Sequence, residues 1–251
     1  MAMPDTAAAL LVEQRGPLLV MTINRPTARN ALTTDVTTLL TEAIERLETD
    51  PSLRVGVLSG AGGGFCAGID LKAFASSGSP TGLKEMLRDR SVKPMVAAVE
   101  GFALGGGLEL ALMCDLIVAA RGTKLGLPEA KFGLLAAGGA LFRIPERLVT
   151  SMVLTGTPLI AEEAADHGLV ARLTDPGQAL AEAIELATAI AANAPLPIAA
   201  ALRLIRSRAG RSEEEMWAMQ VPERDTIFTS SDAREGALAF SEKRVPSWAG
   251  K

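Results

Sequence analysis

The hydrophobic and polar positions along the chain change period several times, and each change marks an expected element. Two apolar runs near the start, residues 7–14 and 17–23, are separated by an Arg-Gly pair, which predicts two strands joined by a tight turn. Apolar residues at helical spacing then predict a helix over 30–49, with Asn30 as its cap. The short apolar run 54–59 predicts another strand. Strands and helices therefore alternate in the first part of the chain.

The middle of the chain carries the clearest pattern. An apolar run at 94–99 predicts a buried strand, three consecutive glycines follow at 105–107, and the next segment is apolar nearly all round, as buried helices are. Amides at a helix start have no partner within the helix and favour negative charge, so this turn is suited to an anion or a developing oxyanion. Glu109 is the only charge within 101–113. On this stretch alone, a structural role for Glu109 is more common than a catalytic one.

A second glycine-rich turn covers residues 60–71. Gly62, Gly64 and Ala67 satisfy a loose G-x-G-x-x-A dinucleotide pattern after a strand. A dinucleotide-binding unit would also end its second strand with an acid about 20 positions on, yet Asp89 lies in a charged, helical pattern. We therefore interpret the turn as a second place where backbone is closely approached.

The rest of the chain becomes steadily more helical. A strand is expected at 116–120, a further short strand at 125–127, a helical turn from residue 128, and a third small-residue turn at 134–139. Helices are expected at 140–155, 161–167, 178–193, 196–208, 213–227 and 232–243, with one strand at 169–173.

Composition excludes several classes of function. The chain has 251 residues and a net charge of −4, no basic block, no Tyr and only 4% aromatic residues, which argues against nucleic-acid binding. The start of the chain lacks a basic n-region, and no apolar run is long enough to span a bilayer, so we expect neither a leader nor a membrane segment. Two cysteines fit a reducing compartment, and we expect a cytoplasmic protein.

The single histidine removes further chemistries. His167 precedes Gly168 at the expected end of a helix, where a structural role is favourable. One His and the distant Cys66 and Cys114 give no metal-ligand spacing, so no metal site is expected. No P-loop and no G-x-S-x-G motif is present.

Five blocks carry a resemblance to a known family. They are N-R-P…N-A-L at 24–32, F-C-A-G-I-D-L at 65–71, A-V-E-G-F-A-L-G-G-G-L-E-L-A…C-D at 98–115, L-P-E…F-G at 127–133 and E-G…F-S-E-K-R at 235–244. In order and spacing they resemble the crotonase family, the enoyl-CoA hydratase/isomerase superfamily, over almost the whole chain. The resemblance implies an α/β fold, a spiral of repeated β-β-α units followed by a helical C-terminal region. It also implies a core with the active site over 1–195 and a trimerisation region over 196–251.

The resemblance also implies catalytic roles. The backbone N–H groups of Ile69 and Gly106 would form an oxyanion hole for a thioester carbonyl. Glu109 would activate water and Glu129 would handle the Cα proton, although the sequence alone does not decide which is acid and which is base. Family isomerases often keep only one such acid, so the pair favours hydration and a catalytic Glu109.

Coenzyme A would be bound as part of the substrate, and no separate cofactor is implied. Each of the three cations expected near its phosphates has the alternative of being a solvated surface charge, and one of them would come from a neighbouring subunit. An apolar acyl pocket is expected from residues 74–87 and 134–141. We expect no nucleic-acid or membrane partner, and a homotrimer or a hexamer built as a dimer of trimers. The expected adenine contacts are Ala31, Ala67, Gly68, Asp70 and Leu71, and the expected phosphate contacts are Arg29, Lys72 and, from the neighbour, Lys243.

One departure from the family pattern keeps other reactions open. Many hydratases have P-G-A-G-G-T where this chain has A-A-G-G-A-L at 136–141, so Ala137 replaces a glycine near the expected water. The leading hypothesis is a 2-enoyl-CoA hydratase of fatty-acyl or related CoA metabolism. An enoyl-CoA isomerase or a dehydratase of another acyl-CoA is the alternative. A non-catalytic CoA-ester binder is the third hypothesis, and the pair Glu109 and Glu129 argues against it.

Overall fold

A six-stranded sheet forms the centre of the computed structural model, which describes residues 8–251. The strand order is β1-β2-β3-β4-β6-β9; β1 and β2 are antiparallel, and all other neighbours are parallel. The inner strands are buried on both faces, as parallel sheets covered by helices are. The bounds are β1 Leu10–Arg15, β2 Leu18–Ile23, β3 Val55–Gly60, β4 Met95–Val99, β6 Leu116–Ala120 and β9 Arg172–Thr174.

A smaller sheet lies beside the first and has the order β5-β7-β8. Its strands are β5 Phe102–Leu104, β7 Lys124–Gly126 and β8 Leu159–Ile160. The chain places β4 in the large sheet and β5 in the small one before a helix, and it does the same with β6 and β7. This alternation confirms the expected α/β spiral of strand–strand–helix units.

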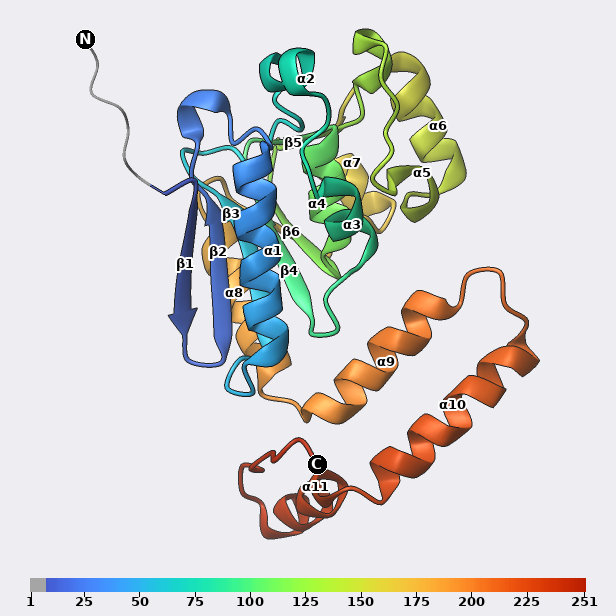
Figure 1. Ribbon diagram of the computed structural model, residues 1–251. Coiled ribbons are helices and arrows are strands. Elements are labelled where there is room, and N and C mark those ends of the chain that lie inside the picture. The colour runs from blue at the N-terminus through green and yellow to red at the C-terminus, as the bar shows by residue number, and fades with distance from the viewer. Residues whose placement is uncertain (1–7) are drawn as a thin grey trace.

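Two helices cover the faces of the large sheet, α1 (Thr34–Thr49) and α8 (Ala179–Ala191) (Figure 1). The face of α8 that meets the sheet carries alanine at every fourth position, 179, 183, 187 and 191, and all four are buried. Positions four apart share one helix face, and small side chains there let the helix lie close to the strands.

Shorter helices gather at the carboxyl ends of the parallel strands. Helix α4 (Gly106–Met113) begins within the three-glycine run, and all eight of its residues are buried, as its apolar sequence predicted. The other elements of this region are α2 Leu71–Ser77, α3 Leu83–Arg88, the 3₁₀ turns η1 Pro26–Ala28 and η2 Glu129–Phe132, α5 Ala140–Arg143, α6 Glu146–Thr155 and α7 Ala161–Asp166.

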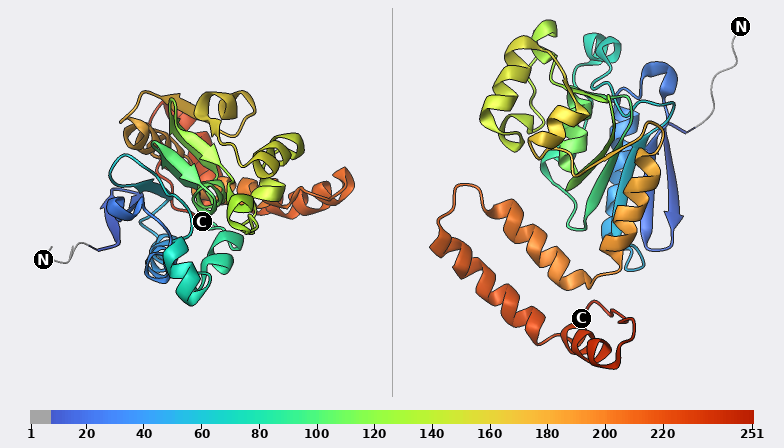
Figure 2. Two further views of the ribbon diagram at one scale, coloured as in Figure 1. Left: turned by 90° about the horizontal axis from the view of Figure 1, so that it is seen from above. Right: turned by 180° about the vertical axis from the view of Figure 1, so that it is seen from behind.

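The last three helices form an arm that extends away from the sheets (Figures 1 and 2). They are α9 Pro195–Ser207, α10 Glu213–Phe228 and α11 Ser231–Glu242, and α10 has no buried residue. Among the hydrogen bonds that join the arm to the core, Arg206 of α9 donates to Asp115 at 2.6 Å, and the Trp248 indole donates to the Ala192 carbonyl at 2.7 Å. The boundary expected between residues 195 and 196 lies at the first residue of α9, directly after the loop that follows α8.

Several local predictions were wrong. Asn30 does not cap α1, because Thr33 does; Asn30 has φ of +55° and bonds to neighbouring loops instead. The helix expected over 140–155 divides into α5 and α6 at Pro145, and the last strand lies at Arg172–Thr174 rather than 169–173. Strand β5 was not predicted because its three residues were assigned to the glycine turn. The expected start of the first strand at residue 7 lies outside the described residues.

Within residues 8–251, no single helix has the length and apolar composition needed to cross a membrane. Only α8 and α9 taken together pass that test, and they are bent by 110° at the break between them.

Candidate active site

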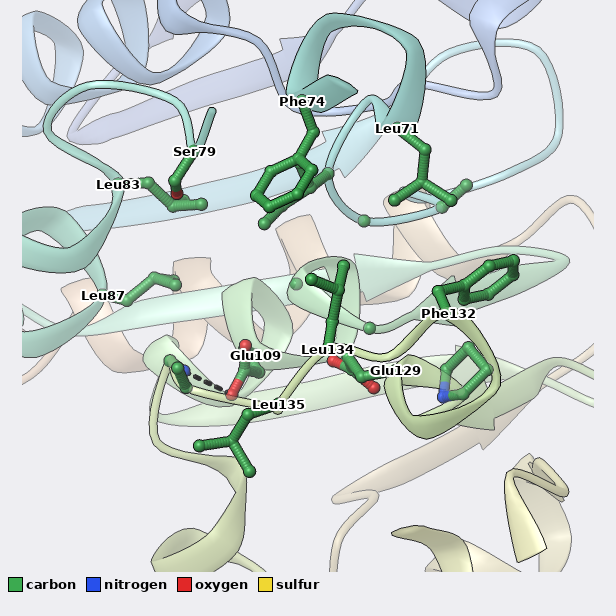
Figure 3. Close-up of a pocket in the computed structure, with 18 of the residues that line it drawn as sticks. Leu71, Phe74, Ser79, Leu83, Leu87, Glu109, Glu129, Phe132, Leu134 and Leu135 are labelled. Carbon is green, nitrogen blue, oxygen red and sulfur yellow. Dashed lines mark hydrogen bonds between the residues drawn. The ribbon is translucent and has the colours of Figure 1, made fainter. Parts of the chain in front are cut away.

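A cavity of about 500 Å³ opens between α2, α3, the start of α4 and the segment from residue 128 to 138. Figure 3 shows Glu109 and Glu129 on one side of it, with Leu71 and Phe74 across from them. Most of the remaining lining is apolar. The lining residues are Ala67, Gly68, Ile69, Leu71, Phe74, Ser79, Leu83, Lys84, Leu87, Gly105, Gly106, Glu109, Pro128, Glu129, Phe132, Leu134, Leu135, Ala137 and Gly138.

The backbone amides of Ile69 and Gly106 lie at the cavity and have no acceptor within residues 8–251. Gly106 is the first residue of α4, where an amide has no partner within the helix. The amides on either side of Ile69 are engaged, because Gly68 donates to the Cys66 sulfur and Asp70 to the Leu32 carbonyl. Within the described chain, neither the Ile69 amide nor the Gly106 amide donates a hydrogen bond. Both therefore remain available to an oxygen in the cavity.

The two glycine-rich turns can lie close to each other because residue 68 is glycine. Its φ is +92°, and a Cβ there would lie 2.8 Å from the Leu104 carbonyl oxygen and 3.2 Å from the Gly106 nitrogen. A side chain at this position would push the turns apart. The sequence interpretation of two surfaces of close backbone approach is thus confirmed, and the two surfaces meet each other.

Glu109 lies in the first turn of α4 and is 4% exposed. Its Oε1 accepts hydrogen bonds from the amides of Gly138 at 2.6 Å and Ala140 at 3.3 Å. Gly138 belongs to the small-residue turn between η2 and α5, and Ala140 is the first residue of α5. A Cβ at Gly138 would lie 2.6 Å from Oε2, so only glycine lets the turn come this close. The second carboxylate oxygen is left on the cavity side.

Glu129 is the first residue of η2, and hydrogen bonds of this turn fix its backbone. Its carbonyl accepts from the Leu134 amide at 3.0 Å, and Lys131 in the same turn donates to the Gly156 carbonyl at 2.8 Å. The side chain is different, because its buried Oε2 has no hydrogen-bond partner within the described residues. A buried oxygen without a partner is costly and indicates a functional position.

The two carboxyl groups have unequal surroundings. Burial raises the pKa of Glu129 to about 7, and the nearby charge of Glu109 adds to that rise. Burial also raises the pKa of Glu109, but the amides of Ala140 and Gly138 and the guanidinium of Arg143 oppose the rise. Hydrogen bonds and a cation stabilise the anion of Glu109, whereas the proton is retained more readily on Glu129. Such a pair can act as base and acid at neutral pH.

The residues expected to bind coenzyme A are divided between the cavity and its surroundings. Ala67, Gly68 and Leu71 line the cavity, whereas the Asp70 carboxylate caps α2 and pairs with Arg25 at 3.4 Å. Ala31 is buried beside the same loop.

The three expected phosphate contacts also lie outside the cavity lining. Arg29 and Lys72 are exposed, and the Arg29 guanidinium lies 4.4 Å from the centre of the Phe102 ring. Lys243 ends α11 on the arm, at the far end of the molecule from α2 (Figures 1 and 2). It could therefore reach such a site only on another subunit.

Sequence reasoning missed several groups at the site. The Gly138 amide was seen only as part of the small-residue turn at 134–139, Ala140 only as the start of an expected helix, and the guanidinium of Arg143 was not considered. Lys84 and Phe132 also line the cavity. The one signal that could have indicated the amides of Gly138 and Ala140 is the run of small residues that follows Glu109 along the chain.

The match to protein families covers most of the chain. Residues 13–251 match the family model described as "Enoyl-CoA hydratase/isomerase". Among curated proteins, enoyl-CoA hydratase EchA19 of Mycobacterium tuberculosis is 41% identical over 99% of both chains. A carnitinyl-CoA dehydratase of Salmonella arizonae is 39% identical over 96% of this chain and 98% of its own.

Solved structures agree with the sequence matches. The crystal structure of enoyl-CoA hydratase EchA1 from Mycobacterium marinum superposes with a TM-score of 0.93 at 48% identity, over 98% of this chain and 100% of that one. An enoyl-CoA hydratase structure from Mycobacterium tuberculosis gives a TM-score of 0.92 at 47% identity, covering 98% of this chain and 100% of its own. Hydratases and dehydratases are both hydro-lyases. The chain therefore belongs to the enoyl-CoA hydratase/isomerase family, also called the crotonase family, and groups with the hydro-lyases of that family.

Proposed function

We propose that this enzyme is a 2-enoyl-CoA hydratase, which adds water across the 2,3 double bond of an enoyl thioester. The observation that carries the proposal is the pairing of two unequal carboxyl groups with two free amides around one cavity. The amides of Ile69 and Gly106 suit an oxygen that gains negative charge, and Glu109 and Glu129 suit proton transfer beside it.

The proposed reaction uses each group once. The thioester oxygen accepts hydrogen bonds from the Ile69 and Gly106 amides, which stabilise the enolate formed in the reaction. The Glu109 carboxylate takes a proton from water as the new C–O bond forms at Cβ. Protonated Glu129 gives its proton to Cα, so that a C–H bond replaces the π bond. The lower proton affinity of Glu109 supports this assignment of base and acid.

Coenzyme A is proposed to enter along the turn at residues 67–71. Ala67, Gly68 and Leu71 line the cavity, and Ala31 and Asp70 lie in the adjoining loops. For the phosphates we propose the exposed cations Arg29 and Lys72, with Lys243 supplied by another subunit.

We also propose a homotrimer, free or paired into a hexamer. Large apolar side chains of the arm are exposed in the single chain, and Phe240 is 88% exposed. An apolar surface of this kind indicates a protein interface. Light scattering coupled to size-exclusion chromatography tests this proposal, and a monomer would refute it. The free thiols of Cys66 and Cys114 support a reducing, cytoplasmic location.

A dehydratase is the second candidate because of the carnitinyl-CoA dehydratases among the relatives. Dehydration is the reverse of hydration, so the same four groups would serve with their protonation states exchanged. The Lys84 ammonium at the cavity favours a neutral acyl chain over one that carries a quaternary ammonium.

Steady-state assays with crotonyl-CoA and longer 2-enoyl-CoAs test the proposal through loss of the absorbance of the conjugated thioester. Glu109→Gln and Glu129→Gln are each expected to lower kcat by about 10²- to 10⁴-fold. If the enzyme instead shifts the double bond of a 3-enoyl-CoA and hydrates no 2-enoyl-CoA, it is an isomerase. If it binds acyl-CoA and transforms none of these substrates or carnitinyl-CoA, the non-catalytic alternative holds.

A further inference from the structure

Arg143 lies behind the catalytic carboxylate, at the end of α5, and its side chain is half-buried. The guanidinium donates to the Leu87 carbonyl of α3 at 2.8 Å and to the Gly138 carbonyl at 3.4 Å. It also lies flat against Gly139, where a Cβ would be only 3.0 Å from Cζ. One side chain therefore joins α3 to the turn at residues 138–140.

The same turn supplies the two amides that bind Glu109. The Gly138 peptide accepts from Arg143 through its carbonyl, while the Gly138 amide donates to Glu109 at 2.6 Å. A movement of the guanidinium would shift the carbonyl, the amide and then the carboxylate. Arg143 of α5 is therefore linked to the Glu109 carboxylate through the Gly138 peptide.

The three arginines around this position differ in whether they have a carboxylate partner. Arg90 and Arg206 lie near Arg143, and both are paired with Asp115, at 2.9 Å and 2.6 Å. Within residues 8–251, Arg143 has no carboxylate within 4.0 Å. The charged groups of other elements that act on Glu109 are Glu129 of η2 and Arg143 of α5, and Lys84 of α3 lines the same cavity.

We propose that Arg143 is a positioning residue that fixes the Glu109 carboxylate through the turn at residues 138–140 and supplies the positive charge behind it. This inference rests on the proposed function, in which Glu109 accepts the proton of water. No comparable cation supports Glu129, whose buried oxygen has no partner in the described part of the chain. Arg143 thereby makes the two carboxyl groups different.

The test compares Arg143→Met, Arg143→Lys and the control Arg147→Met, which changes an exposed arginine four residues further on, in α6. In Arg143→Met we expect kcat to fall between about 10-fold and 100-fold, with KM little changed. The rise of kcat/KM with pH, which reports the ionisation of Glu109, should move to higher pH because the anion has lost its cation. Arg143→Lys should keep this limb near its wild-type position but recover kcat only in part, since an ammonium cannot span both carbonyls. Arg147→Met should match the wild type.

Two results would overturn the inference. One is an Arg143→Met enzyme with unchanged kcat and pH profile; the other is a folded variant whose kcat falls while the acid limb stays in place. A ¹³C NMR titration of the carboxyl groups, with Glu109 assigned through Glu109→Gln, gives a readout that does not need turnover. If the wild type hydrates no enoyl-CoA, the proposed function is wrong. The titration of Glu109 in the Arg143 variants then still decides whether this residue acts on it.

Discussion

Gly138 lies against the carboxylate of Glu109. Adding a methyl group at this position tests whether their contact is needed for a high kcat. In Gly138→Ala, the new Cβ would lie 2.6 Å from Glu109 Oε2 and 2.5 Å from the Leu87 Cδ1 atom. Ordinary contact begins at 3.4 Å, so the carboxylate would have to move by about 0.8 Å. The φ of Gly138 is not in the left-handed region, and backbone strain therefore does not complicate the result.

A displacement of this size is close to the 1 Å misplacement that costs about 10²-fold in rate, equivalent to about 2.7 kcal/mol of activation free energy. We expect kcat for hydration of an enoyl-CoA to fall by about that factor, while a saturated acyl-CoA still binds. Overpacking should also lower the free energy of unfolding by about 1–3 kcal/mol, or about 2–4 °C in Tm for each kcal/mol.

Steady-state kinetics, thermal melts and calorimetric binding of the saturated acyl-CoA measure these three quantities. Gly236→Ala on α11 is the matched control, because its methyl group would meet only the Trp248 ring at 3.3 Å. A folded Gly138→Ala enzyme with wild-type kcat would refute the reasoning that the 138–140 turn holds Glu109 in its reactive position.

Three further predictions concern stability. The raised pKa of Glu129, about 7 against an ordinary 4.5, means that the native state keeps a proton that the unfolded chain releases, so stability should fall as pH rises from about 4.5 through 7. Thermal melts should show Glu129→Gln to be more stable than the wild type above pH 7 and equal to it in acid; a constant difference across pH would contradict this. Asn30→Ala should lower the free energy of unfolding, measured in urea, by about 2–4 kcal/mol, because the variant loses three hydrogen bonds of 2.7–2.9 Å at a position with left-handed backbone. A loss below about 1 kcal/mol would show that these bonds contribute little. Arg206→Met removes the contact between the arm and Asp115 and should lower the free energy of unfolding by about 2–3 kcal/mol. Arg203→Met removes an exposed ion pair and should lower it by less than about 1 kcal/mol; equal losses would show that Arg206 does not hold the arm to the core.

The local features of this protein were present in its sequence. The apolar segment after the glycine turn predicted a buried helix, and α4 is buried at all eight positions with Glu109 in its first turn. The alternation of strands and helices in the first part of the chain was read from the sequence, and the resemblance of the five sequence blocks implied both the spiral core and the family that the comparisons show. These features depend on period and on neighbours along the chain, which a sequence displays directly.

The partners of the reacting groups were decided by the tertiary structure. Glu109 accepts from an amide 29 residues away, and Asn30 bonds to carbonyls 31 and 34 residues away, although its sequence position indicated a helix cap. The difference between Glu109 and Glu129 arises because a distant turn and Arg143 surround only one of them. Periodicity determines which face of an element is buried. Which polar groups meet at that face depends on how elements far apart in the chain pack together, and the pKa values follow from that packing.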